Sequence, residues 1–466
     1  MIAARTMETR DSRPCDVPET ELRALARRLD GRLLEPGDAG YDDARRVWNG
    51  MIDRLPAAIV RCASAGDAWE ALAFARRHDL LVSIRGGGHN VAGHAVCDGG
   101  LMIDLSRMRK VVVDARAGTA TVEPGCTWRD VDAACQAHGL ATTGGVVSHT
   151  GVAGLTLGGG LGHLMGRHGL TCDNVRRLDI VLADGSKVTT SADDEPNLFW
   201  ALRGAGANFG LVTSFVLQLH PLGPEVYGGV CVWPVERADE ALATYRAGCA
   251  AAPDDLALTY GISADPDGSP VASISVGWFG DVAEGPDVVA LLRAAAPEFD
   301  GVRPMPYQVL QSMFDDAVPH GLRRYWKSGF LDHLDDEVIA ALTSRATAMP
   351  TPLSQVVAFH LHGAATRPAH DATAFSHRQE GWDVNVLAQW SDPADTARCS
   401  AWVREVWSQI APSSPASYVN HMDHDEPPAR VRAAYGDNWH RLAHLKRRYD
   451  PDNVFHMNQN IPPNGP

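Results

Sequence analysis

The sequence predicts an α+β protein in two parts, one of which is organised around glycine-rich loops. Strand-like runs alternate with amphipathic segments over residues 46–221, and glycine tracts at 86–88 and 144–174 interrupt this alternation. Residues 222–415 contain fewer glycine clusters and more charged segments with helical spacing. With 466 residues, of which 45% are hydrophobic, the chain is long enough to fill more than one core.

In the first part, the spacing of apolar residues predicts both strands and helices. Alternating or continuous apolar residues predict single strands over 57–63, 80–84, 100–106 and 208–221, and hairpins over 110–125 and 176–191. Helical spacing predicts amphipathic helices over 66–79 and 127–140, with Asp67 near the first start and Gly139 at the second end. This mixture is typical of an α+β domain.

The second part and the two ends complete the predicted organisation. Segments 270–280 and 382–390 have the pattern of strands in a second layer, and 335–349 has the charged, helical pattern of a covering helix. We therefore predict four regions, which are an N-terminal segment (1–45), a first domain (46–221), a second domain (222–415) and a C-terminal segment (416–466).

Composition excludes several classes of partner. The net charge of -15 argues against sequence-independent binding to nucleic acid or to an anionic membrane, because both need a basic surface. The N-terminus has no apolar signal region, and no stretch approaches the length of a membrane span. The nine cysteines are scattered without a CxxC pair, which predicts reduced thiols and no metal site. We expect a soluble cytoplasmic protein, and no pattern specifies its oligomeric state.

The glycine tracts predict a site for an anionic ligand. Segment 144–174 contains ten glycines, too many for a packed helix, and its backbone N–H groups could face a group such as a diphosphate. Long flexible loops are the alternative. A Rossmann site is disfavoured, because the glycines at 204–210 have the wrong spacing and those at 158–162 lack the strand-turn-helix context.

Four motifs carry a resemblance to a known family. They are "RGGGHN" at 85–90, "TGVAGLTLGGGLGHL" at 150–164, "LFWALRGAGANFGLVTSF" at 198–215 and "YDPDNVFHMNQNIPP" at 449–463. In this order they resemble the FAD-linked oxidases of the vanillyl-alcohol-oxidase type. Within that type they are most similar to the berberine-bridge-enzyme-like group, which includes 6-hydroxynicotine oxidase and carbohydrate oxidases. The resemblance implies a PCMH-type FAD-binding domain, to which the C-terminal segment returns, and a substrate domain with an antiparallel sheet backed by helices.

The resemblance implies FAD as the cofactor and a covalent bond to it. In the family, the histidine of the first motif is bonded to the 8α-methyl group of the flavin, and His89 occupies that position. A neutral imidazole is a suitable nucleophile for such a bond near pH 7. The alternative is a loop histidine with a satisfied hydrogen bond. Many members add a cysteine link at the position of Val147, and valine cannot form one, so we predict a single covalent attachment through His89.

Further cofactor contacts follow from the same motifs. Thr150 occupies a position that influences oxygen access in the family, where small apolar residues are frequent, so a threonine raises a monooxygenase-like option. The full set of positions expected to contact FAD, besides His89, is Arg85, Gly86, Gly87, Gly88, Asn90, Gly93, Val147, Ser148, Thr150, Gly151, Gly154, Gly158, Gly159, Gly162, Val212, Asn458 and Asn460.

Catalytic residues are expected near the C-terminus. "SYVNHMD" matches the family's Y-x-N site, which gives Tyr418 and Asn420, and Tyr418 is expected to accept the substrate's hydroxyl proton. A tyrosine that only packs at the seam between domains is the alternative. Other polar residues of the second domain are weaker candidates for substrate contacts, namely Tyr325, Lys327, Asn385 and Gln389.

The function implied by the resemblance is that of an FAD-dependent oxidase. Hydride would pass from a substrate carbon to flavin N5, and O2 would reoxidise the flavin to give H2O2. We expect the substrate to be a small molecule, either a hydroxylated carbohydrate or an intermediate of secondary metabolism. The alternatives are an amine oxidase acting on an N-heterocycle, a flavin-dependent monooxygenase or dehydrogenase, and a non-catalytic flavin-binding protein.

Overall fold

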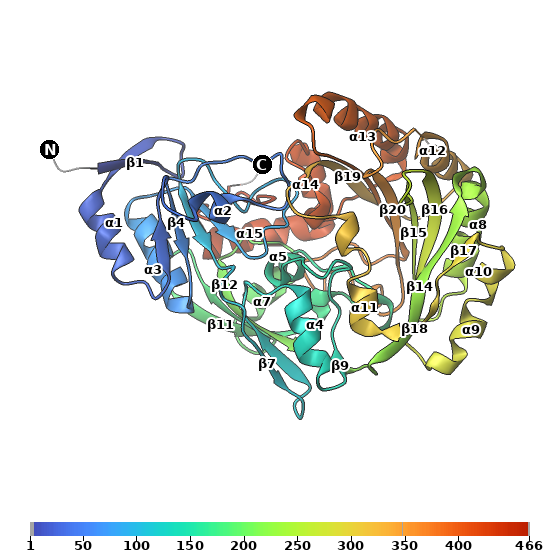
Figure 1. The fold of residues 1–466 in the computed structure, drawn as a ribbon. Coiled ribbons are helices and arrows are strands. Elements are labelled where there is room, and N and C mark those ends of the chain that lie inside the picture. The colour runs from blue at the N-terminus through green and yellow to red at the C-terminus, as the bar shows by residue number, and fades with distance from the viewer. Residues whose placement is uncertain (1–3, 347, 465–466) are drawn as a thin grey trace.

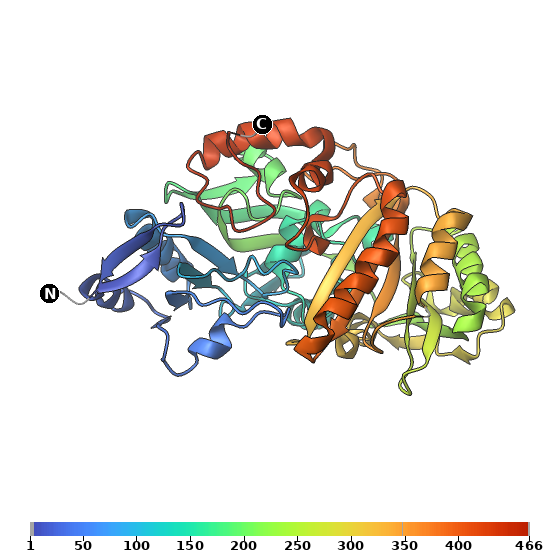
Figure 2. The same cartoon turned by 90° about the horizontal axis from the view of Figure 1, so that it is seen from above.

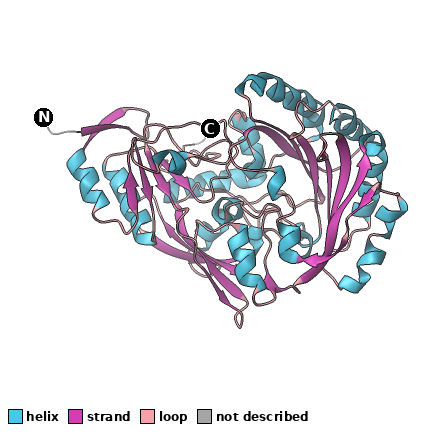
Figure 3. Cartoon of the chain, viewed as in Figure 1, coloured by secondary structure: helices cyan, strands magenta, loops and turns pink. Residues whose placement is uncertain are grey.

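The protein consists of two halves, each built on its own β-sheets with helices packed against them (Figure 1). The computed structural model describes residues 4–346 and 348–464. The ends of the predicted terminal segments (1–3 and 465–466) and Thr347 of the predicted helix 335–349 lie outside the described residues. The mixture of helices and sheets confirms the predicted α+β class, and Figure 3 shows how the strands divide between the halves.

The first half contains a four-stranded and a five-stranded sheet. The smaller sheet has three parallel strands and one antiparallel edge, in the order β3 (Arg32–Leu34), β4 (Ala58–Arg61), β6 (Leu101–Asp104) and β5 (Val82–Arg85). The larger sheet is antiparallel, in the order β11 (Lys187–Ser191), β10 (Val175–Val181), β12 (Leu211–Gln218), β8 (Thr119–Val122) and β7 (Val111–Asp114). All of the single strands and hairpins predicted for residues 57–221 contain strands of these two sheets.

Two helices of the first half, α3 and α4, begin where polar side chains cap them. In α3 (Ala65–Arg77), Ser64 accepts a hydrogen bond from the Asp67 N–H, and α4 (Trp128–Gln136) begins with a capping box of Thr127 and Asp130. Both helices were predicted. The first half also contains α1 (Glu19–Ala26), α2 (Tyr41–Arg45) and α7 (Pro196–Ala201) and the strand pairs β1–β2 (Ala4–Glu8, Pro14–Pro18) and β9–β13 (Leu140–Ala141, His220–Pro221).

The N-terminal segment and the glycine tract both differ in detail from expectation. The predicted boundary at residue 45 separates two paired strands, because β3 pairs with β4. The glycine tract is mostly loop, but it contains two short helices, α5 (Val152–Leu157) and α6 (Met165–His168). Gly154 lies inside α5, which makes one and a half turns between the loops.

The second half is one large antiparallel sheet with helices on its outer face. Its order is β17 (Phe299–Asp300), β14 (Glu225–Pro234), β16 (Pro270–Trp278), β15 (Leu256–Ala264), β20 (Gln355–Leu361), β21 (Gly381–Trp390) and β19 (Arg323–Leu331), and β18 (Arg303–Pro306) also pairs with β14. The covering helices are α8 (Ala238–Ala250), α9 (Gly285–Val288), α10 (Ala290–Ala294), α12 (Asp336–Ala346) and α13 (Thr396–Ile410) (Figure 1). The predicted antiparallel sheet backed by helices is therefore confirmed, and the inner face points towards the first half.

The C-terminal segment returns to the first half. Figure 2 shows α15 (Trp439–Tyr449) beside strands of the first half, after α14 (Pro428–Tyr435). The buried Lys446 ammonium anchors the following loop, because it donates to Asp450 Oδ2 at 2.7 Å and to the carbonyls of Asn208 and Phe455 at 2.6 and 2.8 Å. The tail therefore belongs to the core of the first half.

Two simpler expectations concern the cysteines and membranes. All nine cysteines are free thiols, and eight of them are buried, as expected for reduced thiols in a core. Among the described helices, none has the length and apolar character needed to span a bilayer.

We expect Lys446→Ala to destabilise the protein by about 3–5 kcal/mol, because it leaves the buried Asp450 carboxylate without its cation. Urea unfolding monitored by tryptophan fluorescence measures the change in the free energy of unfolding. Lys110→Ala is the matched control, since that side chain is exposed, and its effect should stay within about 0.5 kcal/mol. Equal stability of the two variants would contradict an anchoring role for Lys446.

Candidate active site between the two halves

A cavity of about 950 Å³ lies between the two halves. On one side it is lined by glycine loops of the first half, over 86–90, 145–154 and 205–207, and by the tail at 457–459. On the other side it is lined by the inner face of β15, β16, β20 and β21 and by residues 418–421. A cavity of this size at an interface between domains is typical of a site that holds a cofactor and a small substrate together.

The two glycine loops touch at Gly87 and Gly151. A Cβ on Gly87 would lie 2.4 Å from the Gly151 Cα, and a Cβ on Gly151 would lie 2.5 Å from the Gly87 nitrogen. Only glycine permits this approach of two backbones, so the motif at 85–90 and the longer glycine tract form one continuous wall. We call the wall formed by these two loops the glycine cradle.

Several features of the cradle fit the FAD that the motifs imply. A Cβ on Gly154 or Gly206 would meet nothing within 4 Å, and both residues line the cavity, so backbone is presented there to open space. In the tail, the Oδ1 atoms of Asn458 and Asn460 are buried and have no hydrogen-bond partner among the described residues. Unpaired buried acceptors of this kind are costly unless a ligand or water satisfies them.

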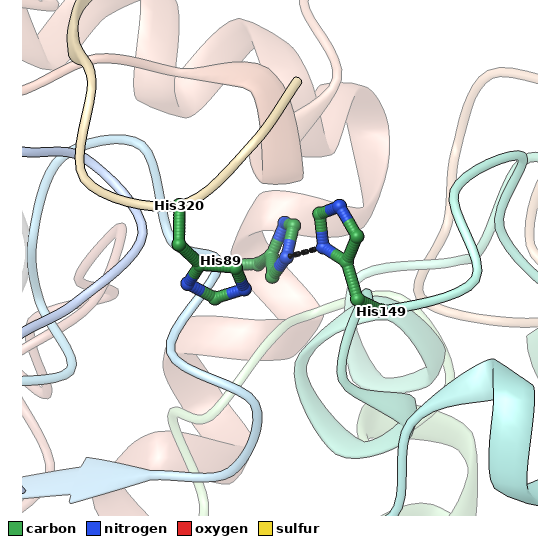
Figure 4. A group of neighbouring side chains, drawn as sticks. All are labelled: His89, His149 and His320. Atoms are coloured by element: carbon green, nitrogen blue, oxygen red, sulfur yellow. Dashed lines mark hydrogen bonds between the residues drawn. The ribbon is translucent and has the colours of Figure 1, made fainter. Parts of the chain in front are cut away.

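His89 lies in a cluster of three imidazoles at the edge of this cradle (Figure 4). Its Nε2 is 2.7 Å from Nδ1 of His149, and its ring stacks on Trp48 with centroids 5.0 Å apart. Burial, followed by the nearby His149 and His320, lowers the pKa of His89 well below its usual value, so the ring is neutral at pH 7. Its Nδ1 has no hydrogen-bond partner in the described part of the chain, so in the tautomer that donates from Nε2 to His149 the Nδ1 lone pair is available for another bond.

The same three histidines also form the kind of donor set that binds transition metals. Their nearest ring nitrogens lie within 4.8 Å of one another, and burial lowers the pKa of His149 and, to about 4, that of His320. The contact between His89 and His149 is nevertheless as short as a hydrogen bond with a proton between the nitrogens, and a metal ligand cannot keep that proton. We therefore describe the cluster as a hydrogen-bonded one.

Tyr418 and Asn420 lie where the predicted site requires them, in the cavity lining. The Tyr418 oxygen accepts hydrogen bonds from the Gly160 N–H at 2.8 Å and from Asn420 Nδ2 at 2.7 Å. Both bonds lower the pKa of Tyr418, but burial outweighs them and raises it, so the hydroxyl keeps its proton at neutral pH. Its assignment as proton acceptor stays a prediction, and these contacts suit a hydroxyl that donates into the cavity.

About half of the predicted cofactor positions line the cavity. These are Gly86, Gly87, Gly88, His89, Asn90, Val147, Thr150, Gly151, Gly154 and Asn458. The others are not among the lining residues, namely Arg85, Gly93, Ser148, Gly158, Gly159, Gly162, Val212 and Asn460. Three of these glycines allow close packing instead, since a Cβ would overlap Asn420 at Gly158, Phe375 at Gly159 and the Gly144 carbonyl at Gly162.

Of the four candidate substrate residues, only Asn385 lines the cavity. Tyr325 and Lys327 point to the other face of β19, where the hydroxyl donates to Asp425 at 2.7 Å and the ammonium pairs with Asp425 and Glu426. Gln389 accepts from Arg324 at 2.8 Å at the end of the sheet. Tyr325 and Lys327 thus tie β19 to the C-terminal segment, and Gln389 binds Arg324 on the neighbouring strand, so the placement of these three side chains gives no support to a substrate contact.

The sequence reasoning missed several residues that the fold brings to the cavity. Trp48, Trp326 and His421 line it, and the carboxylate of Asp383, which is fully buried on β21, lies behind His421. His421 follows the Y-x-N site directly, so it could have been singled out. Trp48 and Trp326 carried no such signal, because an isolated tryptophan is more often a core residue.

Gly151→Ala and Gly154→Ala separate the two roles of the glycines. We expect Gly151→Ala to lower the free energy of unfolding by about 1–3 kcal/mol, because its Cβ collides with the backbone of the other loop. Gly154→Ala places its Cβ in open space within α5, so it should stabilise the flavin-free protein by about 0.5–1 kcal/mol. The same methyl group should weaken FAD binding, because it enters the cavity.

Urea unfolding of the flavin-free protein and titration with FAD, followed by quenching of flavin fluorescence, measure the two effects. Both titrations use protein that also carries His89→Ala, so that no covalent bond obscures affinity. Loss of FAD affinity in Gly151→Ala alone would contradict the assignment of Gly154 to the ligand side of the cradle.

Two segments of the chain match models of known protein families. The model of the FAD binding domain matches residues 56–191, and the model of the berberine and berberine-like family matches residues 417–462. These matches cover the cavity-lining loops at 86–90 and 145–154 and the returning tail at 457–459, whereas the loop at 205–207 lies outside both matches.

Proteins that are similar to nearly the whole chain are also FAD-linked oxidoreductases or oxidases by name. An FAD-linked oxidoreductase of Dictyostelium discoideum is 31% identical over 441 residues, covering 93% of this chain and 95% of the relative. The (R)-6-hydroxynicotine oxidase of Paenarthrobacter nicotinovorans is 28% identical over 455 residues, covering 94% and 98%. The crystal structure of 6-hydroxy-D-nicotine oxidase from Arthrobacter nicotinovorans superimposes with a TM-score of 0.86 at 27% identity, covering 93% of this chain and 98% of that one. The chain therefore belongs to the FAD-linked oxidoreductases with a berberine-bridge-like C-terminal segment, as its motifs had indicated.

Proposed function

We propose that the protein is an FAD-dependent oxidase that oxidises a hydroxylated small molecule. When bound, FAD supplies a hydride acceptor at N5 and passes the electrons to O2, which leaves as H2O2. The observation that carries the proposal is the single cavity in which the glycine cradle and His89 face Tyr418, Asn420 and Asn385. Such a cavity holds cofactor and substrate within contact of each other, which hydride transfer requires.

The attachment of FAD is proposed to be a single bond to His89. Support comes from the neutral ring and from Nδ1, which has no hydrogen-bond partner among the described residues, while Nε2 is engaged by His149. Val147, at the position of the second link in other members, lines the cavity but has no nucleophilic atom. His89 therefore acts as a tether, and the loops at 86–88 and 151–154 exclude water from around it.

A polyhydroxylated substrate fits the wall contributed by the second half. Hydroxyl and amide side chains on the inner face of the sheet line the cavity, namely Thr259, Ser263, Ser273, Ser275, Gln355 and Asn385. Trp326 adds an aromatic face of the kind that packs against a sugar ring. Together they provide the dispersed hydrogen bonds that a carbohydrate or an oxygenated metabolite needs.

An amine oxidase is the second candidate. It is supported by the relative named (R)-6-hydroxynicotine oxidase and by three carboxylates in the cavity lining, Asp265, Asp267 and Asp316, which would favour a cation. Amines and alcohols differ in whether a hydroxyl proton must be removed, so substrate profile separates the two candidates.

A substrate panel tests the function directly. We expect sugars or other alcohols to bleach the oxidised flavin under anaerobic conditions, and air to restore its colour with about one equivalent of H2O2 per turnover. Stopped-flow absorbance and a peroxidase-coupled assay measure the two steps. Bleaching by amines alone would favour the second candidate, and reoxidation without peroxide would indicate a monooxygenase or dehydrogenase instead.

The covalent bond is tested by acid precipitation. We expect the wild-type pellet to stay yellow and a flavin-bearing peptide containing His89 to appear by mass spectrometry. His89→Ala should release its flavin into the acid supernatant, and His138→Ala, at an exposed histidine outside the cavity, should not. A colourless wild-type pellet would contradict the tether.

A further inference from the structure

A second histidine in the cavity is paired with a buried carboxylate. His421, at the end of a short 3-10 helix (Val419–His421), lies with its Nδ1 3.0 Å from Oδ2 of Asp383 on β21. The Asp383 side chain is fully buried, and its Oδ1 has no hydrogen-bond partner in the described part of the chain. A carboxylate in such a place is costly unless a cation or a proton donor faces it.

The surroundings hold this pair in a fixed orientation. The Asp383 Oδ2 accepts from Asn385 Nδ2 at 2.9 Å, and Asn385 Oδ1 accepts from Trp326 Nε1 at 2.9 Å. Trp326 in turn stacks on the His421 ring, with centroids 4.7 Å apart and an angle of 21°. His421, Asp383, Asn385 and Trp326 thus form a closed set in which each side chain positions the next.

The free edge of His421 faces the cavity. His421 lines it, and neither ring nitrogen has a hydrogen-bond partner among the described residues, although Nδ1 lies 3.0 Å from Oδ2 of Asp383. The ring meets Tyr418 edge-on, with centroids 4.8 Å apart, so both side chains reach the same part of the cavity. A substrate oxygen placed there would be within reach of a hydroxyl donor and of an imidazole lone pair.

We propose that His421, positioned by Asp383, is the catalytic residue that takes the hydroxyl proton of the substrate. This proposal rests on the alcohol oxidation proposed above. In that reaction the substrate O–H bond breaks and its proton moves to Nε2 of His421. The C–H electron pair leaves as hydride, for which FAD is the oxidant, and a C=O bond forms. The resulting imidazolium is stabilised by the Asp383 carboxylate.

Other titratable groups near the pair do not take this role as readily. Tyr418 keeps its own proton, since burial raises its pKa, and its oxygen already accepts two hydrogen bonds. His377, which is close enough to sense the charge of Asp383, stacks on Phe330, and burial lowers its pKa to about 4. His377 is therefore neutral near pH 7 and does not neutralise Asp383.

The first experiment is kinetic. The probe is whichever alcohol of the panel bleaches the flavin fastest, followed anaerobically from pH 5 to pH 9. We expect His421→Gln to slow bleaching about 10²–10⁴-fold and to abolish the rise of rate with pH, with little change in the concentration for half-saturation. Imidazole added to His421→Ala should restore part of the rate. A loss below tenfold, or an unchanged pH profile, would overturn the proposal.

The second experiment needs no substrate, so it distinguishes failure of this proposal from failure of the proposed function. In flavin-loaded protein labelled at 13Cε1 of histidine, the resonance absent from His421→Gln identifies His421. We expect Asp383→Asn to move this resonance at pH 7, because the ring loses the charge that lies 3.0 Å from its Nδ1. His138→Gln, at an exposed site, serves as the control and should leave the resonance in place. An unmoved resonance in Asp383→Asn would overturn the coupling even if no alcohol proved to be a substrate.

Discussion

The contact between Gly87 and Gly151 is the constraint on which the site depends. It joins the loop after β5 to the loop before α5, and no side chain larger than hydrogen fits at either position. Because the two backbones meet, His89 and Gly154 line the same cavity although they are distant in the chain. The two sheets of the first half provide rigid ends for these loops, and this is why many glycines do not make the region disordered.

The two histidines on opposite sides of the cavity, His89 and His421, lie in different electrostatic surroundings. Burial removes water from the His89 ring, which makes no ion pair with a carboxylate in the described part of the chain, so the ring is neutral and nucleophilic. Beside His421 there is a buried carboxylate instead, because Oδ2 of Asp383 lies 3.0 Å from its Nδ1. A chain with 19 histidines thus assigns two of them different chemistry by the presence or absence of one aspartate. The arrangement suits a flavin tether on one wall and a proton acceptor on the other.

The sequence was sufficient to predict most of the first half and the cradle. Alternating apolar residues located its strands. The order of the motifs identified His89, Thr150 and Asn420, and all three residues line the cavity. Strands β14, β15 and β20 of the second half were not predicted, although the Pro- and Gly-containing turn at 265–268 follows β15 directly. The missed pair of His421 and Asp383 depends on a contact between residues 38 positions apart, which no local pattern encodes.

The errors among substrate residues have one physical cause, the alternation of side chains across a strand. Neighbours on β19 point to opposite faces, so Trp326 reaches the cavity while Tyr325 and Lys327 reach Asp425 on the far side. The pairing of Trp326 with Leu387 puts two cavity-lining residues opposite each other on adjacent strands. Polarity alone would favour Lys327 as the residue that lines the cavity. The strand register instead turns Trp326 towards the cavity and Lys327 away from it. Which side chains line the cavity is therefore set by the face of β19 and β21 that is turned towards it, and polarity is a poor guide to them.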